Sequence, residues 1–276
     1  ASAAFPIREG ELLAARFLGA VDMTPTGAQQ RAIADIIADF EKPHPMARLL
    51  EGDVGSGKTV VALSAMLLAC ENNAQSVLMA PTEILAEQHF QSFISYFSHL
   101  PIQIGLITGS GCKKFPSKVN PNEATAIPRA QLLKWVANGE IPILIGTHAL
   151  IQKSVKFKNL ALCIIDEQHR FGVKQRAELT DQSPDILPHF LSMSATPIPR
   201  TMAIALFGDL DISFISELPQ GRKKIITKII SLSLVSFVSL VMFCALLEPS
   251  ILEATSVNDS VVVTLDVDSG ITIDSP

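Results

Sequence analysis

The chain has 276 residues, a net charge of −5 and 48% hydrophobic residues, which is enough material for one large domain or two small ones. The negative charge excludes a protein that holds nucleic acid through bulk positive charge, so any DNA contact has to be local. Cysteines occur far apart and without zinc spacing, at Cys70, Cys112, Cys163 and Cys244. We therefore expect reduced thiols, no zinc and a cytoplasmic location.

Short apolar runs alternate with helical patterns through residues 1–222. Expected strands lie at Leu49–Leu50, Ser76–Ala80, Gln103–Thr108, Pro142–Gly146, Leu162–Asp166 and Phe190–Ser194. Expected helices lie at Gly27–Phe40, Lys58–Glu71, Ile84–Phe97, Arg129–Asn138 and Arg200–Phe207. Ser110–Pro128 breaks this rhythm with three prolines and is expected to be a surface insertion. The alternation predicts an α/β fold with a doubly wound parallel sheet, helices on both faces and ligand groups at the carboxyl ends of the strands.

A phosphate-binding loop follows the first expected strand. The pattern G-x-x-x-x-G-K-[ST] is matched at every fixed position by Gly52, Asp53, Val54, Gly55, Ser56, Gly57, Lys58 and Thr59. Glycines let successive N–H groups point into one concavity at the start of a helix, where anions bind well. In this pattern Lys58 reaches the β- and γ-phosphates and the Thr59 hydroxyl ligates Mg²⁺. The loop predicts binding of ATP with Mg²⁺.

Two adjacent acids end a later apolar strand. Asp166 at the strand tip can hold the Mg²⁺ that Thr59 presents, and Glu167 can orient and deprotonate the attacking water. Adjacent acids on an exposed loop would mean little, but these follow a buried strand downstream of a phosphate loop. The pair predicts ATP hydrolysis, with Lys58, Asp166 and Glu167 as the catalytic residues.

The order Asp-Glu-x-His, which ends at His169, resembles the DEAD/DEAH-like motif of superfamily-two helicases. Four longer sequence segments resemble the RecG family of ATP-dependent branched-DNA helicases. They are Gly146–Gln152, Asp166–Val173, Ser194–Thr201 and Gly208–Asp211. The transcription-repair coupling factors are the nearest rival family. The resemblance extends from about residue 18 to about residue 230 and implies a P-loop RecA-like domain, the first motor lobe of such a helicase.

The resemblance also implies roles for residues outside the phosphate loop. Gln29 would hydrogen-bond the adenine base. His169, Ser194 and Thr196 would couple hydrolysis to movement between two lobes. Contacts to the backbone of branched DNA, such as forks and Holliday junctions, are implied for Thr82, Gly109, Thr147 and His148. For His148 an alternative is that it only satisfies a backbone carbonyl.

Three parts of the resembled family are not found in this sequence: a wedge domain, the second RecA-like lobe and its late arginine motif. An arginine finger from the second lobe is worth roughly 10³–10⁵ in rate. We therefore expect this lobe alone to bind ATP weakly and to hydrolyse it slowly. The opposing hypothesis is a non-catalytic module that binds ATP and DNA.

The last part of the chain differs in composition. We divide the chain into a RecA-like domain (1–222), a basic and hydrophobic segment (223–254) and a β-prone fragment (255–276). Lys223–Lys228 followed by the uncharged Ile229–Leu247 resembles a signal peptide. One hypothesis is a chimera of a helicase lobe with the start of an exported protein. A membrane anchor at 229–247 and a packed C-terminal helix are the alternatives.

Overall fold

The computed structural model describes residues 3–7, 25–98, 100–118, 120–152, 154–166, 186–195, 210–217, 252–257 and 260–265. The chain divides into two compact units, Ala1–Gln220 and Gly221–Pro276. The expected helix Arg200–Phe207 and the apolar segment Ile229–Leu247 lie outside the described residues.

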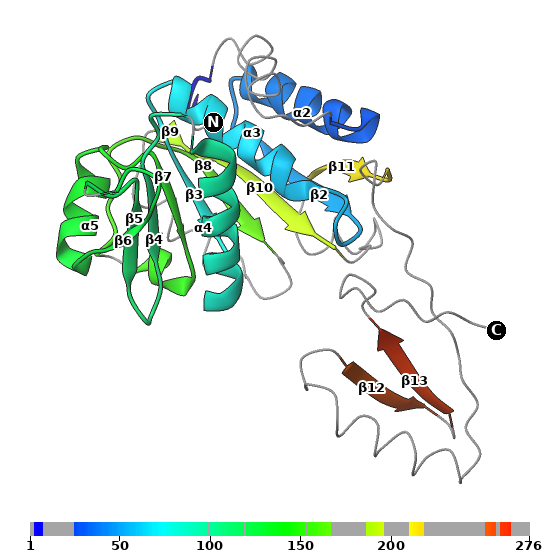
Figure 1. Cartoon of the computed structure of the whole chain (residues 1–276). Coiled ribbons are helices and arrows are strands. Elements are labelled where there is room, and N and C mark those ends of the chain that lie inside the picture. Colours follow the sequence, from blue (N-terminus) through cyan, green and yellow to red (C-terminus); the bar gives the residue numbers. More distant parts are fainter. Residues whose placement is uncertain are drawn as a thin grey trace. The chain divides into compact units, whose positions relative to one another are not determined.

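A nine-stranded sheet forms the centre of the first unit, in the order β11-β2-β10-β8-β3-β7-β4-β5-β6 (Figure 1). Its strands are β2 (Ala47–Gly52), β3 (Gln75–Met79), β4 (Ile104–Ile107), β5 (Cys112–Phe115), β6 (Thr125–Ala126), β7 (Ile143–Gly146), β8 (Leu160–Asp166), β10 (His189–Ser194) and β11 (Asp211–Ile215). From β11 to β4 every neighbouring pair is parallel. The α/β prediction with a mostly parallel RecA-like sheet is confirmed.

The helices of the first unit are α2 (Gly27–Phe40), α3 (Lys58–Glu71), α4 (Glu83–Phe97) and α5 (Arg129–Ala137), with a 3₁₀ turn η1 (His148–Ile151). Two of the helices begin after a threonine cap. The Thr26 hydroxyl accepts from the Gln29 N–H, and the Thr82 hydroxyl accepts from the Leu85 N–H. These caps satisfy amide groups that have no partner inside the helix and so fix where α2 and α4 begin.

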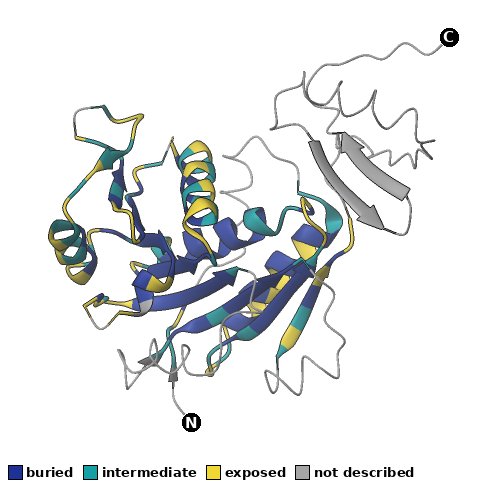
Figure 2. Cartoon of the chain, turned by 90° about the horizontal axis from the view of Figure 1, so that it is seen from below, coloured by how far each residue is buried: buried dark blue, intermediate teal, exposed yellow. Residues whose placement is uncertain are grey.

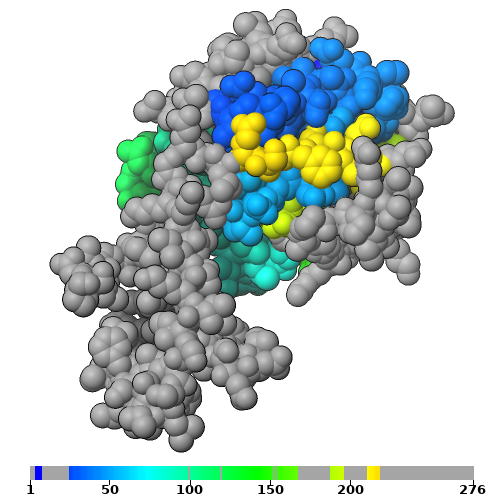
Figure 3. All heavy atoms as spheres, turned by 90° about the vertical axis from the view of Figure 1, so that its right-hand side faces the viewer, coloured from blue at the N-terminus to red at the C-terminus, as the bar shows by residue number. Residues whose placement is uncertain are grey.

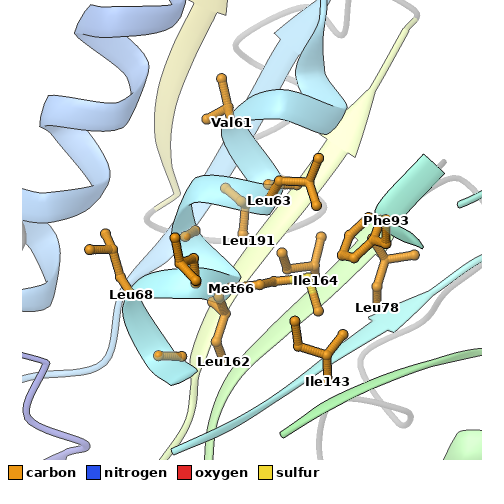
Figure 4. Close-up of a cluster of buried hydrophobic side chains, with 14 of the residues drawn as sticks. Val61, Leu63, Met66, Leu68, Leu78, Phe93, Ile143, Leu162, Ile164 and Leu191 are labelled. Carbon is orange, nitrogen blue, oxygen red and sulfur yellow. The ribbon is translucent and has the colours of Figure 1, made fainter. Parts of the chain in front are cut away.

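The core lies on both faces of the sheet because alternate strand residues point to opposite sides. On one face α3 packs against β8, β10 and β3, where Leu63 and Met66 lie among Leu162, Ile164 and Leu191 (Figure 4). On the other face α5 and η1 cover Val77, Met79, Leu144, Cys163 and Ile165. The central strands β2, β3, β4, β7, β8 and β10 are buried almost throughout (Figure 2). Helix α3 is buried from Val60 to Ala69, as expected of a helix that is apolar all round.

The two edges of the sheet differ from the sequence prediction. Ser110–Pro128 was expected to be a surface insertion, but β5 and β6 inside it pair antiparallel and extend the sheet. At the other edge β11 was not predicted. It lies on the surface along α2 (Figure 3) and is attached by Arg48, which bonds Asp39 at 2.7 Å and Ser213 Oγ at 2.8 Å.

A buried histidine ties the start of β10 to its surroundings. His189 is fully buried, its Nδ1 accepts from the Met46 N–H at 3.0 Å, and its Nε2 contacts the Phe5 carbonyl at 2.8 Å. Because one ring nitrogen accepts and a carbonyl can only accept, the ring is neutral with its hydrogen on Nε2. Burial lowers the pKa of His189, which agrees with the neutral form. Beside it, β1 (Ala3–Ala4) pairs with β9 (Ile186–Leu187).

In the second unit, β12 (Leu252–Val257) pairs antiparallel with β13 (Ser260–Leu265). The fragment 255–276, which the sequence predicted to be β-prone, contains β13. Among the residues that the structure describes, no helix combines the length and the apolar character needed to cross a bilayer.

Candidate functional site

The carboxyl ends of six neighbouring parallel strands form one edge of the sheet. Strand register aligns them, because Glu51 pairs with Ser194, Met193 with Asp166, Ile165 with Met79, and Gly146 with both Met79 and Ile107. The candidate residues therefore follow one another along this edge. In spatial order they are the phosphate loop after β2, Ser194 on β10, Asp166 on β8, Thr82 after β3, Thr147 after β7 and Gly109 after β4.

The phosphate loop has a backbone that only glycine adopts easily. Gly55 and Gly57 have φ of 75° and 85°, in the left-handed region. A Cβ on Gly52 would lie 2.7 Å from Ser56 Oγ and 2.9 Å from the Ile215 carbonyl. The loop thus needs glycine for its turn and for the close approach of β11. Helix α3 begins directly after it, so the N–H groups of the first turn face the loop.

The donors in this loop fit a polyphosphate. Lys58 Nζ donates to the carbonyls of Gly52 at 2.6 Å and Asp53 at 3.0 Å, which holds the ammonium group against the loop. Ser56 is 1% exposed, and its buried Oγ has no hydrogen-bond partner among the described residues. Thr59 lies half-buried in the first turn of α3, where its hydroxyl is a hard oxygen ligand of the kind Mg²⁺ prefers. Val54, between these groups, is 71% exposed.

Gln29 is held by the protein on both sides of its amide. Its Nε2 donates to the Ser56 carbonyl at 2.8 Å, and its Oε1 accepts from the Thr26 N–H at 2.9 Å. Gln29 is 2% exposed. The side chain therefore joins the start of α2 to the phosphate loop. Adenine reading by Gln29 stays a prediction.

Asp166 ends β8 and contacts a histidine from a different part of the chain. His89 Nε2 lies 2.7 Å from Asp166 Oδ2, and the two side chains are only 12% and 13% exposed. His89 lies in the middle of α4. No local pattern indicates this pair, because 77 residues separate its members and only the strand order brings them together.

The phosphate loop, Ser194 and Asp166 form the nucleotide half of the sheet edge, and its remaining candidates are described only in part. Ser194 is fully buried at the end of β10, beside the strand that leads into the phosphate loop. Glu167, His169 and Thr196 lie outside the described residues. A pocket on the β11 side of the loop is lined by Glu51, Gly52, Asp53, Ala195, Phe214, Ile215 and Ser216. Within the described part of the chain, no three His, Cys, Asp or Glu residues are grouped as metal ligands.

The residues predicted to contact DNA, which are Thr82, Gly109, Thr147 and His148, form the other half of the edge, called the DNA half here. In it, the amide groups of Gly109 and Ser110 contact a carboxylate of the protein. Glu83 Oε1 accepts from the Gly109 N–H at 2.8 Å and from the Ser110 N–H at 3.2 Å. Hydrogen bonds from the Ser110 hydroxyl and then from these amides hold the pKa of Glu83 below its usual value. Two adjacent N–H groups that bind a carboxylate form a small anion site, and the sequence reasoning missed Glu83 in this role.

The two other DNA candidates lie at the end of β7. Thr147 precedes η1 and is 9% exposed, and its N–H donates to the Ile107 carbonyl. His148 is exposed at the first position of η1. The structure thus brings Thr82, Gly109, Thr147 and His148 to the same edge as the phosphate loop, on neighbouring strands.

The chain is similar to known helicases. Residues 26–204 match the DEAD/DEAH box helicase family. The chain is 48% identical over 222 residues to the ATP-dependent DNA helicase RecG of Synechocystis sp., which covers 80% of this chain and 25% of that protein. It is 49% identical over 212 residues to RecG of Bacillus subtilis, which covers 77% of this chain and 29% of that protein. The chain therefore spans less than a third of the length of these relatives.

Solved helicase structures are also similar to this chain. The structure of RecG bound to a three-way DNA junction matches with a TM-score of 0.66 and 38% identity, over 87% of this chain and 30% of that one. The helicase MrfA bound to DNA matches with a TM-score of 0.54 and 17% identity, over 78% of this chain and 31% of that one. The second likeness concerns the fold alone.

Proposed function

Because the chain belongs to the DEAD/DEAH box helicase family and is homologous to part of RecG, we propose that it is the ATP-binding motor lobe of a RecG-like helicase. The motor lobe would be residues 1–222. Its DNA would be branched, as at forks and Holliday junctions, and the process would be recombination and repair. A second RecA-like lobe and a wedge domain would be the partners of this lobe in a working helicase.

One observation carries the proposal: the nucleotide candidates and the DNA candidates occupy adjacent strand ends of one sheet. The phosphate loop, Ser194 and Asp166 lie on β2, β10 and β8, and the DNA candidates follow β3, β7 and β4. The halves meet where β8 pairs with β3, at Ile165 and Met79. In such an arrangement, binding or hydrolysis of ATP at the phosphate loop would shift the neighbouring loops that contact DNA.

In the nucleotide half, the chain's own groups would bind and orient ATP. The amides of the phosphate loop and Lys58 would hold the phosphate oxygens. Thr59 and Asp166 would hold Mg²⁺, which when bound neutralises the charge that develops on the β- and γ-phosphates. Glu167 would orient the attacking water and accept its proton. Ser194, Thr196 and His169 would couple ATP hydrolysis at this site to movement of a second lobe.

In the DNA half, the contacts would be to phosphates and not to bases. The hydroxyl groups of Thr82 and Thr147 would donate to phosphates, and the Gly109 amide would do so in competition with Glu83. Such groups suit a grip on the backbone that does not depend on sequence. His148 would add an exposed imidazole at the same edge. A branched-DNA enzyme needs this kind of grip, because it meets junctions of any sequence.

An ATPase assay on the full chain, with and without forked DNA, tests the proposal. We expect binding of ATP, slow hydrolysis, an increase in rate on addition of forked DNA, and loss of the activity in Glu167→Gln. A chain that binds ATP and DNA but shows no hydrolysis above the Glu167→Gln background would instead be a non-catalytic module. A chain that binds no ATP would overturn the proposal as a whole.

A further inference from the structure

The contact between His89 and Asp166 has no role in the function proposed so far. It joins α4 to the end of β8, with 2.7 Å between Nε2 and Oδ2. Helix α4 lies against β4 and β7, in the DNA half of the sheet edge. Its position there is fixed by Phe90 and Phe93, which are fully buried on the turns next to His89. The contact therefore crosses from one half of the edge to the other.

The chemistry of the pair gives each group one direction of hydrogen bonding. A carboxylate that ligates a cation has lost its proton and can only accept. In that form of Asp166 the His89 Nε2 must therefore donate, to Oδ2. This hydrogen bond restricts rotation of the carboxylate, and it leaves Oδ1 and the second lone pair of Oδ2 for a cation or for one of its waters. Carboxylates that ligate metals are commonly oriented by an outer hydrogen-bond partner of this kind.

We propose that His89 is a positioning residue for the cation site. It holds the Asp166 carboxylate in one rotamer, in which the carboxylate would be a ligand for the Mg²⁺ that accompanies ATP, and it makes that rotamer depend on the position of α4. This inference rests on the proposed function, since it takes Asp166 as a ligand of Mg²⁺. His89 belongs to neither the phosphate loop nor the acid pair.

A merely structural role predicts a different result. The two side chains are mostly buried, so loss of the contact leaves the carboxylate without its partner and would lower the unfolding free energy, while ligand binding would stay unchanged. A positioning role predicts that the affinity for the cation falls while binding of nucleotide without a cation stays the same. The two roles are separated by measuring cation and nucleotide affinities independently.

The experiment uses the full chain with Mn²⁺ as the probe, because bound and free Mn²⁺ differ in their electron paramagnetic resonance signal. His89→Leu keeps the bulk of the side chain without a donor, and His89→Gln places an amide N–H near the position of Nε2. In the presence of ATP we expect His89→Leu to weaken Mn²⁺ binding about tenfold or more, in the range known for outer partners of metal ligands. His89→Gln should recover most of the affinity.

A control on the same helix is Gln91→Ala, which removes an exposed polar side chain and should bind Mn²⁺ like the wild type. ATP binding in EDTA should be equal in all variants. Equal Mn²⁺ affinities for His89→Leu, His89→Gln and wild type would overturn the inference. If His89→Leu does not fold by circular dichroism, His89→Asn, whose amide is too short to reach Asp166, replaces it.

Asp166→Asn separates this inference from the proposed function. Wild type that binds no Mn²⁺ with ATP, or an Asp166→Asn variant that binds it equally well, would overturn the cation site itself and the inference with it. Loss of Mn²⁺ in Asp166→Asn, together with unchanged binding in His89→Leu, would overturn the role of His89 alone.

Discussion

The two halves of the sheet edge are built in different ways. In the nucleotide half, the phosphate-binding groups are consecutive in the chain, and glycine φ angles of 75° and 85° set the loop. In the DNA half, the candidates come from three separate loops, and their polar groups are held by the protein itself. Thr82 caps α4, and the Gly109 amide contacts Glu83. A continuous motif fixes its own geometry, whereas a dispersed site depends on the packing of the whole sheet.

Loss of the Lys58 ammonium group should give the largest change in affinity, and the change should concern ATP alone. Lys58→Ala removes a charged donor that would bind phosphate, and such hydrogen bonds contribute about 1.5–3 kcal/mol. We expect the Kd for ATP to rise roughly tenfold to a hundredfold, measured by fluorescence titration. Lys134→Ala, an exposed lysine on α5, is the control. Equal ATP affinities in both variants would contradict the assignment.

A methyl group on Gly52 tests whether the loop depends on the edge strand β11. Gly52→Ala places a Cβ 2.9 Å from the Ile215 carbonyl, and overpacking of this kind costs about 1–3 kcal/mol. Urea unfolding should show that loss, together with weaker ATP binding. Gly111→Ala is the matched control, because a Cβ there meets nothing within 4 Å. A Gly52→Ala chain as stable as Gly111→Ala would show that the loop yields easily.

Neutralising Glu83 should change DNA binding alone, and it should strengthen that binding where the two preceding variants weaken ATP binding. Glu83→Gln removes the negative charge that the Gly109 and Ser110 amides now bind, so a DNA phosphate competes better for them. We expect the affinity for forked DNA to rise about threefold, measured by fluorescence anisotropy. Glu123→Gln makes the same charge change at an exposed position and should raise it less. Weaker DNA binding in Glu83→Gln would show that the carboxylate supports the site.

The smallest effect is expected for His189 at the amino end of β10, and it concerns the pH dependence of stability. Burial lowers the pKa of His189, so below about pH 6.5 the unfolded chain binds more protons than the folded one. The free energy of unfolding therefore has its full value above that pH and decreases as the pH is lowered. His189→Gln should make this fall smaller between pH 7 and 5, measured by urea unfolding, and leave ATP and DNA binding unchanged. An unaltered pH dependence would contradict the assignment.

Local signals explain what could be predicted from sequence. Helices α2 and α3 begin and end at the predicted residues because a threonine cap and the phosphate loop mark their starts. The edge strands β5, β6 and β11 were missed because they are short, polar or partly exposed. The contacts of His89 and Glu83 were missed for another reason. Each joins residues that meet only after β3, β4 and β8 have taken their places in the sheet.

The position of β10 has a consequence for how the chain folds. This strand lies between β2 and β8, and its first residue contacts Met46 across a sequence separation of 143 residues. During synthesis, β2 and β8 emerge without the strand that separates them, so their ends take their final spacing only when β10 inserts. Such non-local pairing is slow. An arrest of translation before residue 189 would therefore leave a phosphate loop whose neighbouring acid strand has no fixed place beside it.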